Sequence, residues 1–122
     1  MSLPTRELLP DERRSDEVRA QIAAFHPAVV ERVKQAVSSH RVVVVGMAHN
    51  PFVKRARKAL GSAGVDFEYL EFGSYTSRWK ERLAIKIWSG YPTYPQVFVD
   101  GVLIGGFAEL RRSLDAGTLR PA

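Results

Sequence analysis

Apolar residues along the chain change their spacing from segment to segment, and each spacing predicts one element. Residues 42–45 are four consecutive valines, a β-branched run typical of a central strand buried on both faces. Residues 66–72 alternate in character and predict a second strand, and a helix is expected between the two over residues 51–63. The order strand, helix, strand predicts a right-handed βαβ unit.

Two helices are predicted before the valine run. Residues 15–26 begin with Ser15, a good N-cap, followed by acidic residues. Pro27 ends this segment and suits the first turn of a second helix, where its missing N–H costs no hydrogen bond. The apolar positions that carry the two patterns are Val18, Ile22, Phe25, Val29, Val30, Val33 and Val37.

Two more helices are predicted in the second half of the chain. One spans residues 76–89, and a last one runs from Phe107 to Leu114 and stops near Gly117. The positions with core-like spacing in the first of these helices are Trp79, Leu83, Ile87 and Trp88.

Residues 93–106, with the sequence TYPQVFVDGVLIGG, predict a β-hairpin. Two short apolar runs, 97–99 and 102–104, are separated by Asp100 and Gly101. This dipeptide adopts the positive φ angles of a type I′ turn readily, so the two strands are expected to pair directly.

The same segment resembles the second half of glutaredoxins, in which a Thr-x-Pro turn with a cis proline and a Gly-Gly turn flank the glutathione groove. Pro95 and the pair Gly105–Gly106 stand at these turns, and residues 89–92 (SGYP) are similar to the monothiol branch. The resemblance covers residues 28–117. It implies an α/β, thioredoxin-like fold with a four-stranded mixed sheet flanked by helices, preceded here by an extra N-terminal helix.

The length of 122 residues allows one domain. We expect a flexible tail over residues 1–14, an extra helix over 15–26 and the glutaredoxin-like domain over 27–122. No apolar run is long enough to span a bilayer and no secretory signal opens the sequence, so a cytoplasmic location and no membrane partner are expected. The net charge of +5 comes from basic residues interleaved with acids, which does not indicate a nucleic-acid partner.

The chain contains no cysteine. Glutaredoxins carry a Cys-Pro-aromatic-Cys or Cys-Gly-Phe-Ser motif after the first strand, where this chain has Asn50 at the nucleophile position and Val53 at the resolving position. Without a protein thiolate we expect neither thiol–disulfide exchange nor an iron–sulfur cluster, unless a partner supplies the ligand. The three histidines share no ligand spacing, so no metal site is predicted.

Asn50 is predicted to cap the helix that begins at Pro51, because its amide oxygen can accept an N–H of the first turn. Alternatively, its NH₂ group donates to the thiolate of a bound glutathione, although asparagine cannot attack as a nucleophile. His49 is either a base near that thiol or an exposed loop residue.

The resemblance also implies a glutathione groove. The backbone before the cis proline pairs with the cysteinyl part, a helix N-terminus holds the γ-glutamyl carboxylate, and an arginine clamps the glycyl carboxylate. Two charges of the family are missing, since Met47 replaces a lysine and Ala108 an aspartate, with Glu109 next to it. The aligned positions are Tyr94, Pro95, Gly106, Phe107, Ala108 and Arg82.

The cations of the 51–63 helix either add positive charge beside the groove or form an ordinary solvated face; they are Lys54, Arg55, Arg57 and Lys58.

These observations predict a redox-inactive glutaredoxin-related protein that binds glutathione or a peptide, or that serves as an interaction module. The alternative is a glutathione-dependent enzyme. It would be either transferase-like, with His49, Tyr94 or Asn50 polarising the thiol, or the disulfide oxidoreductase of redox homeostasis that the family label suggests. The oligomeric state does not follow from the sequence.

Overall fold

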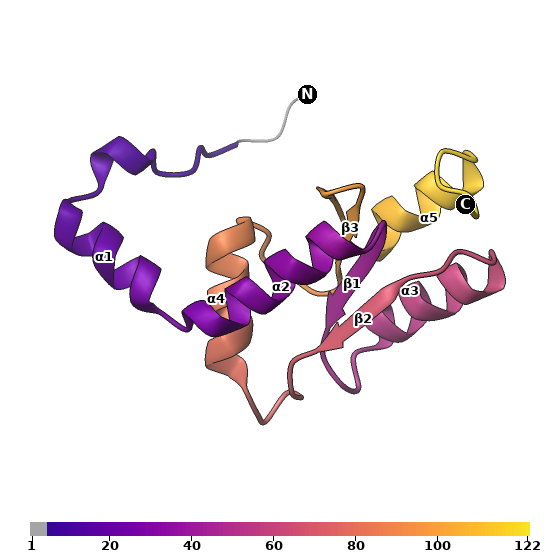
Figure 1. The fold of residues 1–122 in the computed structure, drawn as a ribbon, viewed down its shortest axis with the longest axis horizontal. Coiled ribbons are helices and arrows are strands. Elements are labelled where there is room, and N and C mark those ends of the chain that lie inside the picture. Colours follow the sequence, from indigo (N-terminus) through magenta and orange to yellow (C-terminus); the bar gives the residue numbers. More distant parts are fainter. Residues whose placement is uncertain (1–4) are drawn as a thin grey trace.

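Four strands form one mixed sheet in the order β2–β1–β3–β4 (Figure 1). In this computed structural model, which describes residues 5–122, the strands are β1 (Val42–Gly46), β2 (Glu68–Glu71), β3 (Gln96–Val99) and β4 (Val102–Gly105). β1 pairs in parallel with β2 and antiparallel with β3, and β3 pairs antiparallel with β4. The predicted mixed sheet with its parallel βαβ unit is confirmed.

Helices cover both faces of this sheet (Figure 1). Side chains of α2 (Pro27–Ser39) and α4 (Trp79–Ser89) join one hydrophobic cluster, and those of α5 (Phe107–Asp115) join the other. α3 (Pro51–Ser62) contributes Ala56 and Leu60 to the cluster shared with α5, and only Val53 to the cluster of α2 and α4. None of the helices among residues 5–122 has the length and apolar character needed to cross a membrane.

The valine run of β1 supplies both clusters. Val43 and Val45 lie in the α2/α4 cluster, while Val42 and Val44 lie in the α3/α5 cluster. Alternate side chains of a strand point to opposite faces, so a strand covered on both sides must be apolar throughout. The prediction of a doubly buried central strand is confirmed.

The hairpin between β3 and β4 turns at Asp100 and Gly101, whose φ angles are 51° and 81°. Positive φ at both central residues is what a type I′ turn requires. Val99 pairs with Val102 directly across the turn, as the sequence predicted.

Three helices begin at the predicted caps or helix-starting residues, and a fourth begins later than predicted. The Ser15 hydroxyl accepts a hydrogen bond from the Val18 N–H at 3.1 Å at the start of α1 (Asp16–Ala24), and Pro27 opens α2. Asn50 caps α3. α4 begins at Trp79 rather than residue 76, because Arg78 is left-handed, with a φ of 56°.

The structure describes only part of the predicted tail over residues 1–14. Residues 1–4 lie outside the described residues, and Asp11–Arg13 form a short 3₁₀ helix that the sequence did not predict. Local backbone hydrogen bonds hold this turn, and the spacing of apolar residues does not reveal such bonds.

The predicted core-facing side of α4 is wrong. The four large apolar residues with core-like spacing, Trp79, Leu83, Ile87 and Trp88, are between 38% and 57% exposed. The helix instead turns Arg82, Ala84 and Ile85 inward, and these three are nearly or fully buried. α4 therefore carries two apolar sides, of which the one with smaller residues and an arginine meets the sheet.

Candidate functional site

A groove of about 590 Å³ opens where α3 begins, beside the turn before β3 and the start of α5. Chain segments far apart in sequence meet here because the sheet brings the end of β1, the start of β3 and the end of β4 together. The predicted site positions that line it are Asn50, Tyr94, Pro95, Gly106, Phe107 and Ala108.

Asn50 is a helix cap on the wall of this groove. Its Oδ1 accepts hydrogen bonds from the N–H groups of Phe52 and Val53 at 2.9 and 3.1 Å. Its side-chain NH₂ donates to no acceptor among residues 5–122, so it remains available to a ligand. Val53 does not line the groove; it is 1% exposed and belongs to the α2/α4 hydrophobic cluster.

Tyr94 and Pro95 form the turn before β3, and the peptide bond between them is cis. The Tyr94 hydroxyl donates to the carbonyl oxygen of Arg82 at 2.6 Å, inside the protein. Burial raises the pKa of Tyr94 well above the ordinary tyrosine value. This hydroxyl is therefore fixed and un-ionised at neutral pH, and it does not serve as an acid or base for a bound thiol.

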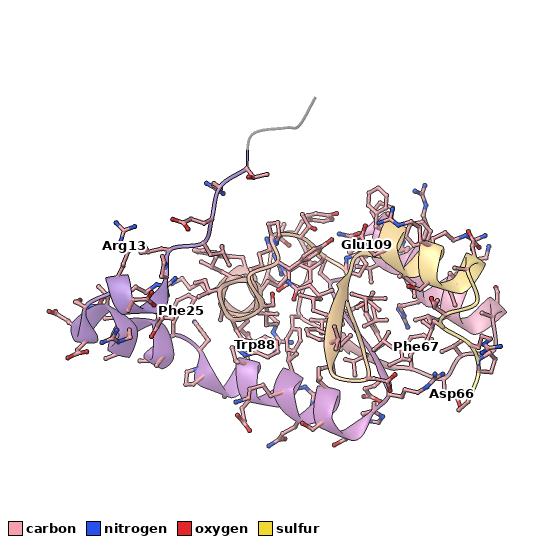
Figure 2. All side chains as sticks on the ribbon, turned by 90° about the horizontal axis from the view of Figure 1, so that it is seen from above. Arg13, Phe25, Asp66, Phe67, Trp88 and Glu109 are labelled. Atoms are coloured by element: carbon pink, nitrogen blue, oxygen red, sulfur yellow. The ribbon has the colours of Figure 1, made fainter. Side chains whose placement is uncertain are left out.

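The start of α5 carries its own carboxylate, that of Glu109 (Figure 2). Glu109 Oε1 accepts from the Gly106 N–H at 2.8 Å and from the Tyr91 hydroxyl at 3.1 Å. The Gly106 N–H, with smaller contributions from Tyr91 and Arg112, holds the pKa of Glu109 below its usual range, against the opposing effect of partial burial. Among the described residues, the N–H groups of Phe107 and Ala108 have no acceptor and remain open to a ligand anion.

The two glycines before α5 make room for this arrangement. Gly105 has a φ of 127°, and a Cβ built there would lie 2.5 Å from the Glu109 side chain. A Cβ on Gly106 would lie 3.2 Å from the Tyr91 hydroxyl oxygen. The backbone at Gly105 and Gly106 is thus approached closely by side chains of the protein itself.

Arg82 and Lys86 lie one turn apart on α4 but occupy different surroundings. Arg82 does not line the groove: it is 7% exposed, and its Nη1 donates to the carbonyl oxygens of Ser77 and Phe72, the latter at 2.9 Å. Lys86 lines the groove, with its Nζ 5.5 Å from the centroid of the Tyr94 ring. Sequence reasoning placed the cation at Arg82 and missed Lys86, although the i, i+4 spacing puts both on one side of the helix.

The remaining candidates lie outside the groove lining. His49 is exposed, with a φ of 65°, and does not line it. The four cations of α3 are exposed too, and Arg55 and Arg57 stack over the rings of Phe52 and Tyr69. This arrangement favours the solvated-face interpretation of the α3 cations.

The groove wall is otherwise mostly aromatic and apolar, with Met47, Phe52, Tyr75, Tyr91 and Pro92 among its residues. Within the described part of the chain, no three His, Asp or Glu side chains are grouped to hold a metal ion. An iron–sulfur cluster does not fit the groove either, because its wall offers no thiolate.

Comparison with known proteins assigns the family. The glutaredoxin family model matches residues 42–104. A glutaredoxin-like protein of Dictyostelium discoideum is 49% identical over 107 residues, which span 88% of this chain and 87% of that protein. Glutaredoxin-C1 of Arabidopsis thaliana is 30% identical over 93 residues, covering 76% and 74% of the two chains. The chain belongs to the glutaredoxin family, as the resemblance of its second half indicated.

Solved structures agree on the fold. A buckwheat glutaredoxin, solved as a complex with glutathione, superimposes with a TM-score of 0.67 at 23% identity, over 87% of this chain and 90% of that one. A wheat glutaredoxin gives a TM-score of 0.64 at 27% identity, over 75% and 88%. The protein is thus a glutaredoxin-like protein that has the fold of the family and no cysteine.

Proposed function

We propose that this protein binds glutathione in the groove described above and performs no thiol–disulfide exchange. The observation that carries the proposal is that the groove gathers open N–H groups, a cation and the cis-proline turn, while residue 50 is an asparagine that caps α3. The buckwheat relative solved with glutathione supports the choice of ligand.

The charges of the groove suit an extended tripeptide with charged ends. The free N–H groups of Phe107 and Ala108 would hold the carboxylate of the γ-glutamyl residue of glutathione. Glu109 lies next to them and would pair with the ammonium group of that γ-glutamyl residue. Lys86 supplies the positive charge for the glycyl carboxylate. The cysteinyl backbone would pair with Tyr94, which leaves the side-chain NH₂ of Asn50 as the donor available to the sulfur.

No covalent step follows from binding. Disulfide exchange requires a protein thiolate to attack or to leave, and an amide nitrogen does neither. The transferase-like alternative has less support, since the Tyr94 hydroxyl points to Arg82 and His49 lies outside the groove lining. The function is therefore recognition of the tripeptide, or of a peptide end with the same charges.

A titration of ¹⁵N-labelled protein with reduced glutathione tests the proposal. We expect a Kd on the order of millimolar, because two charged contacts of the family are replaced by Met47 and Ala108 and each is worth roughly 1–2 kcal/mol. The amide shifts should concentrate at Tyr94, Gly106 and Phe107. S-methylglutathione is the matched ligand: it keeps every charge, so it should bind with similar affinity. Saturating glutathione without shifts at these amides would contradict the proposal.

A further inference from the structure

Beside Asn50, the candidate glutathione groove has an aromatic wall formed by Phe52 and Tyr75. Both rings line the groove, and the two residues are 50% and 63% exposed. Met47 lines the groove too, at the position where the family has a lysine, and is 6% exposed. None of the tripeptide contacts proposed above involves Phe52 or Tyr75. Exposed apolar surface of this kind marks ligand grooves in soluble proteins, so a further part of a ligand is expected to cover the two rings.

Contacts within the protein hold the aromatic wall in position. The Ala48 N–H donates to the carbonyl oxygen of Gly73 at 2.8 Å, which joins the loop after β1 to the loop that carries Tyr75. On α3, the guanidinium carbon of Arg55 lies 5.2 Å from the centroid of the Phe52 ring. Because the wall is formed without a ligand, little further ordering of the protein is needed when a ligand covers it.

The start of α3 favours a neutral sulfur in the ligand. Asn50 Oδ1 accepts the N–H groups of Phe52 and Val53. Pro51 has no N–H, and the Lys54 N–H donates to the carbonyl oxygen of Asn50 at 3.1 Å. The first turn of α3 therefore has no open N–H group that could stabilise a thiolate. The Asn50 NH₂ remains, and it can donate to a thioether sulfur, which is a weak acceptor. A free thiol is thus not required for binding.

We propose that the groove selects S-conjugates of glutathione, thioethers whose sulfur carries an apolar or aromatic substituent, over free glutathione. The substituent lies against Phe52 and Tyr75, where it removes apolar surface from water and contacts the two rings. The flexible side chain of Met47 adapts to its shape. This inference rests on the proposed function, because the tripeptide part of the conjugate is held by the groups assigned there.

Titrations of the ¹⁵N-labelled wild type with S-benzylglutathione and S-methylglutathione test the inference, because the two ligands share every charge and differ in the aromatic ring. The Kd of S-benzylglutathione should be lower by roughly tenfold or more. Its amide shifts should reach Phe52 and Tyr75 in addition to Tyr94, Gly106 and Phe107. The mixed disulfide of glutathione and cysteine carries a polar substituent on the same sulfur, and it should bind no more tightly than S-methylglutathione.

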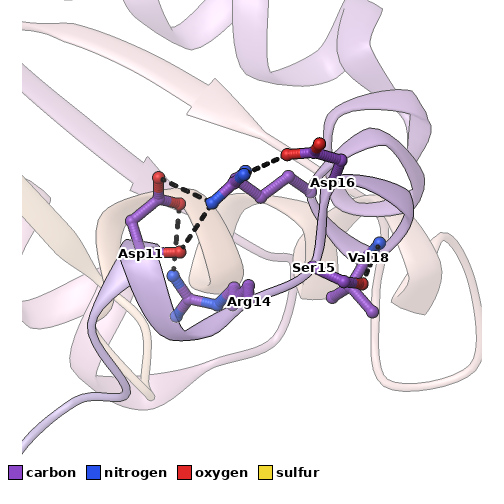
Figure 3. Close-up of polar contacts among 6 residues, drawn as sticks. Asp11, Arg14, Ser15, Asp16 and Val18 are labelled. Atoms are coloured by element: carbon purple, nitrogen blue, oxygen red, sulfur yellow. Dashed lines mark hydrogen bonds and ion pairs between the residues drawn. The ribbon is translucent and has the colours of Figure 1, made fainter.

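Phe52→Ala and Tyr75→Ala locate the substituent on the protein. Each variant removes one ring of the aromatic wall, so each should lower the ratio of the S-methylglutathione Kd to the S-benzylglutathione Kd by roughly threefold or more. Both residues are substantially exposed, so the fold should survive, as circular dichroism would verify. Val18→Ala is the matched control. Val18 is an exposed apolar residue in the first turn of α1, where its N–H donates to Ser15 (Figure 3), and it does not line the groove. The Kd ratio of this variant should equal that of the wild type.

The outcomes separate this inference from the function on which it rests. Equal Kd values for the two thioethers, with shifts at Tyr94, Gly106 and Phe107, would overturn the inference and leave the proposed function intact. No binding of either thioether would overturn both. A preference for S-benzylglutathione that persists undiminished in both alanine variants would overturn the inference, because the ring would then lie elsewhere. Binding of the mixed disulfide as tight as that of S-benzylglutathione would overturn it as well, since an apolar substituent would not be what the groove selects.

Discussion

Asn50 Oδ1 accepts the N–H of Val53 at 3.1 Å, so the two positions that carry redox chemistry in glutaredoxins are joined here by a capping hydrogen bond. A second bond from the Phe52 N–H, at 2.9 Å, completes the cap. In a thiol enzyme, the open N–H groups of such a helix stabilise a thiolate. In this chain the neutral amide oxygen of Asn50 accepts hydrogen bonds from two of these N–H groups, so they cap the helix instead of stabilising a thiolate.

The first prediction is that the protein has no glutathione-dependent reductase activity. Without a thiolate no mixed disulfide can form on the protein, whatever the affinity of the groove. In an assay coupled to glutathione reductase, the rate should equal that of a heat-treated sample. A rate well above that of the heated sample would contradict the prediction, because it would mean that the protein catalyses glutathione-dependent reduction without a cysteine.

The second prediction concerns the cation of the groove. Lys86→Ala should weaken glutathione binding by roughly five- to tenfold, because one charge-assisted contact to a carboxylate is lost. Lys58→Ala removes an exposed charge of the same sign from α3, outside the groove lining, and should leave the affinity unchanged. The ¹⁵N titration measures both. Equal effects of the two substitutions would mean that only the overall charge matters.

The third prediction separates Arg82 from Lys86. Arg82→Ala should lower the free energy of unfolding by roughly 3 kcal/mol, because the carbonyl oxygens of Phe72 and Ser77 lose a charged donor in a buried place. Urea unfolding measures this loss, with Arg55→Ala, an exposed arginine of α3, as the control that should change stability little. If Arg82→Ala left stability unchanged and abolished glutathione binding, the role expected from the sequence, in which Arg82 binds the glycyl carboxylate, would be supported instead.

Much of the scaffold could be predicted because local signals agree with it. The valine run, the Asp100–Gly101 turn and the Asn50–Pro51 helix start each have one strongly preferred conformation, and the structure adopts it. The family resemblance then located the groove, since the cis-proline turn and the double glycine stand at its edges.

The orientation of α4 could not be predicted in the same way. Its sequence has large apolar residues on more than one side, so their spacing along the helix does not identify the side that packs against the sheet. Arg82 became the candidate for the groove through its alignment with an arginine of the family, and the alignment does not show that Arg82 is buried in this chain while Lys86 lines the groove. Glu109 was noticed only as a neighbour of the missing aspartate, because a carboxylate that bonds to the Gly106 N–H needs three-dimensional information.

The fourth prediction concerns pH. The hydrogen bond from the Gly106 N–H holds the pKa of Glu109 below its unfolded value of about 4.3, so the unfolded state binds this proton more readily. Glu109 thus contributes stability that is fully present above the unfolded pKa and is lost as the pH falls through the lower folded pKa. In Glu109→Gln this part of the acid dependence should be absent, and in Tyr91→Phe it should be reduced. Urea unfolding at a series of acidic pH values measures it; profiles identical to the wild type in both variants would refute the assignment.

The fifth prediction restores the missing sulfur. Asn50→Cys places a thiol at the N-terminus of α3, where the open N–H groups should lower its pKa below the free value of about 8.5. The variant also loses the cap, so its free energy of unfolding should fall by about 1 kcal/mol. Ser62→Cys is the matched control, since it puts an exposed thiol at the opposite end of the same helix, where the dipole has the other sign.

The most direct test of the account is the intact mass of these two folded variants after incubation with glutathione disulfide at neutral pH. If the groove is complete except for its nucleophile, Asn50→Cys should take up one glutathione rapidly, and Ser62→Cys should react only at the slow rate of an ordinary exposed thiol. Met47→Lys added to Asn50→Cys should speed the reaction by strengthening the hold on the anionic tripeptide. A folded Asn50→Cys protein that reacts no faster than Ser62→Cys would show that the groove does not bind glutathione, and that the family relationship extends to the fold alone.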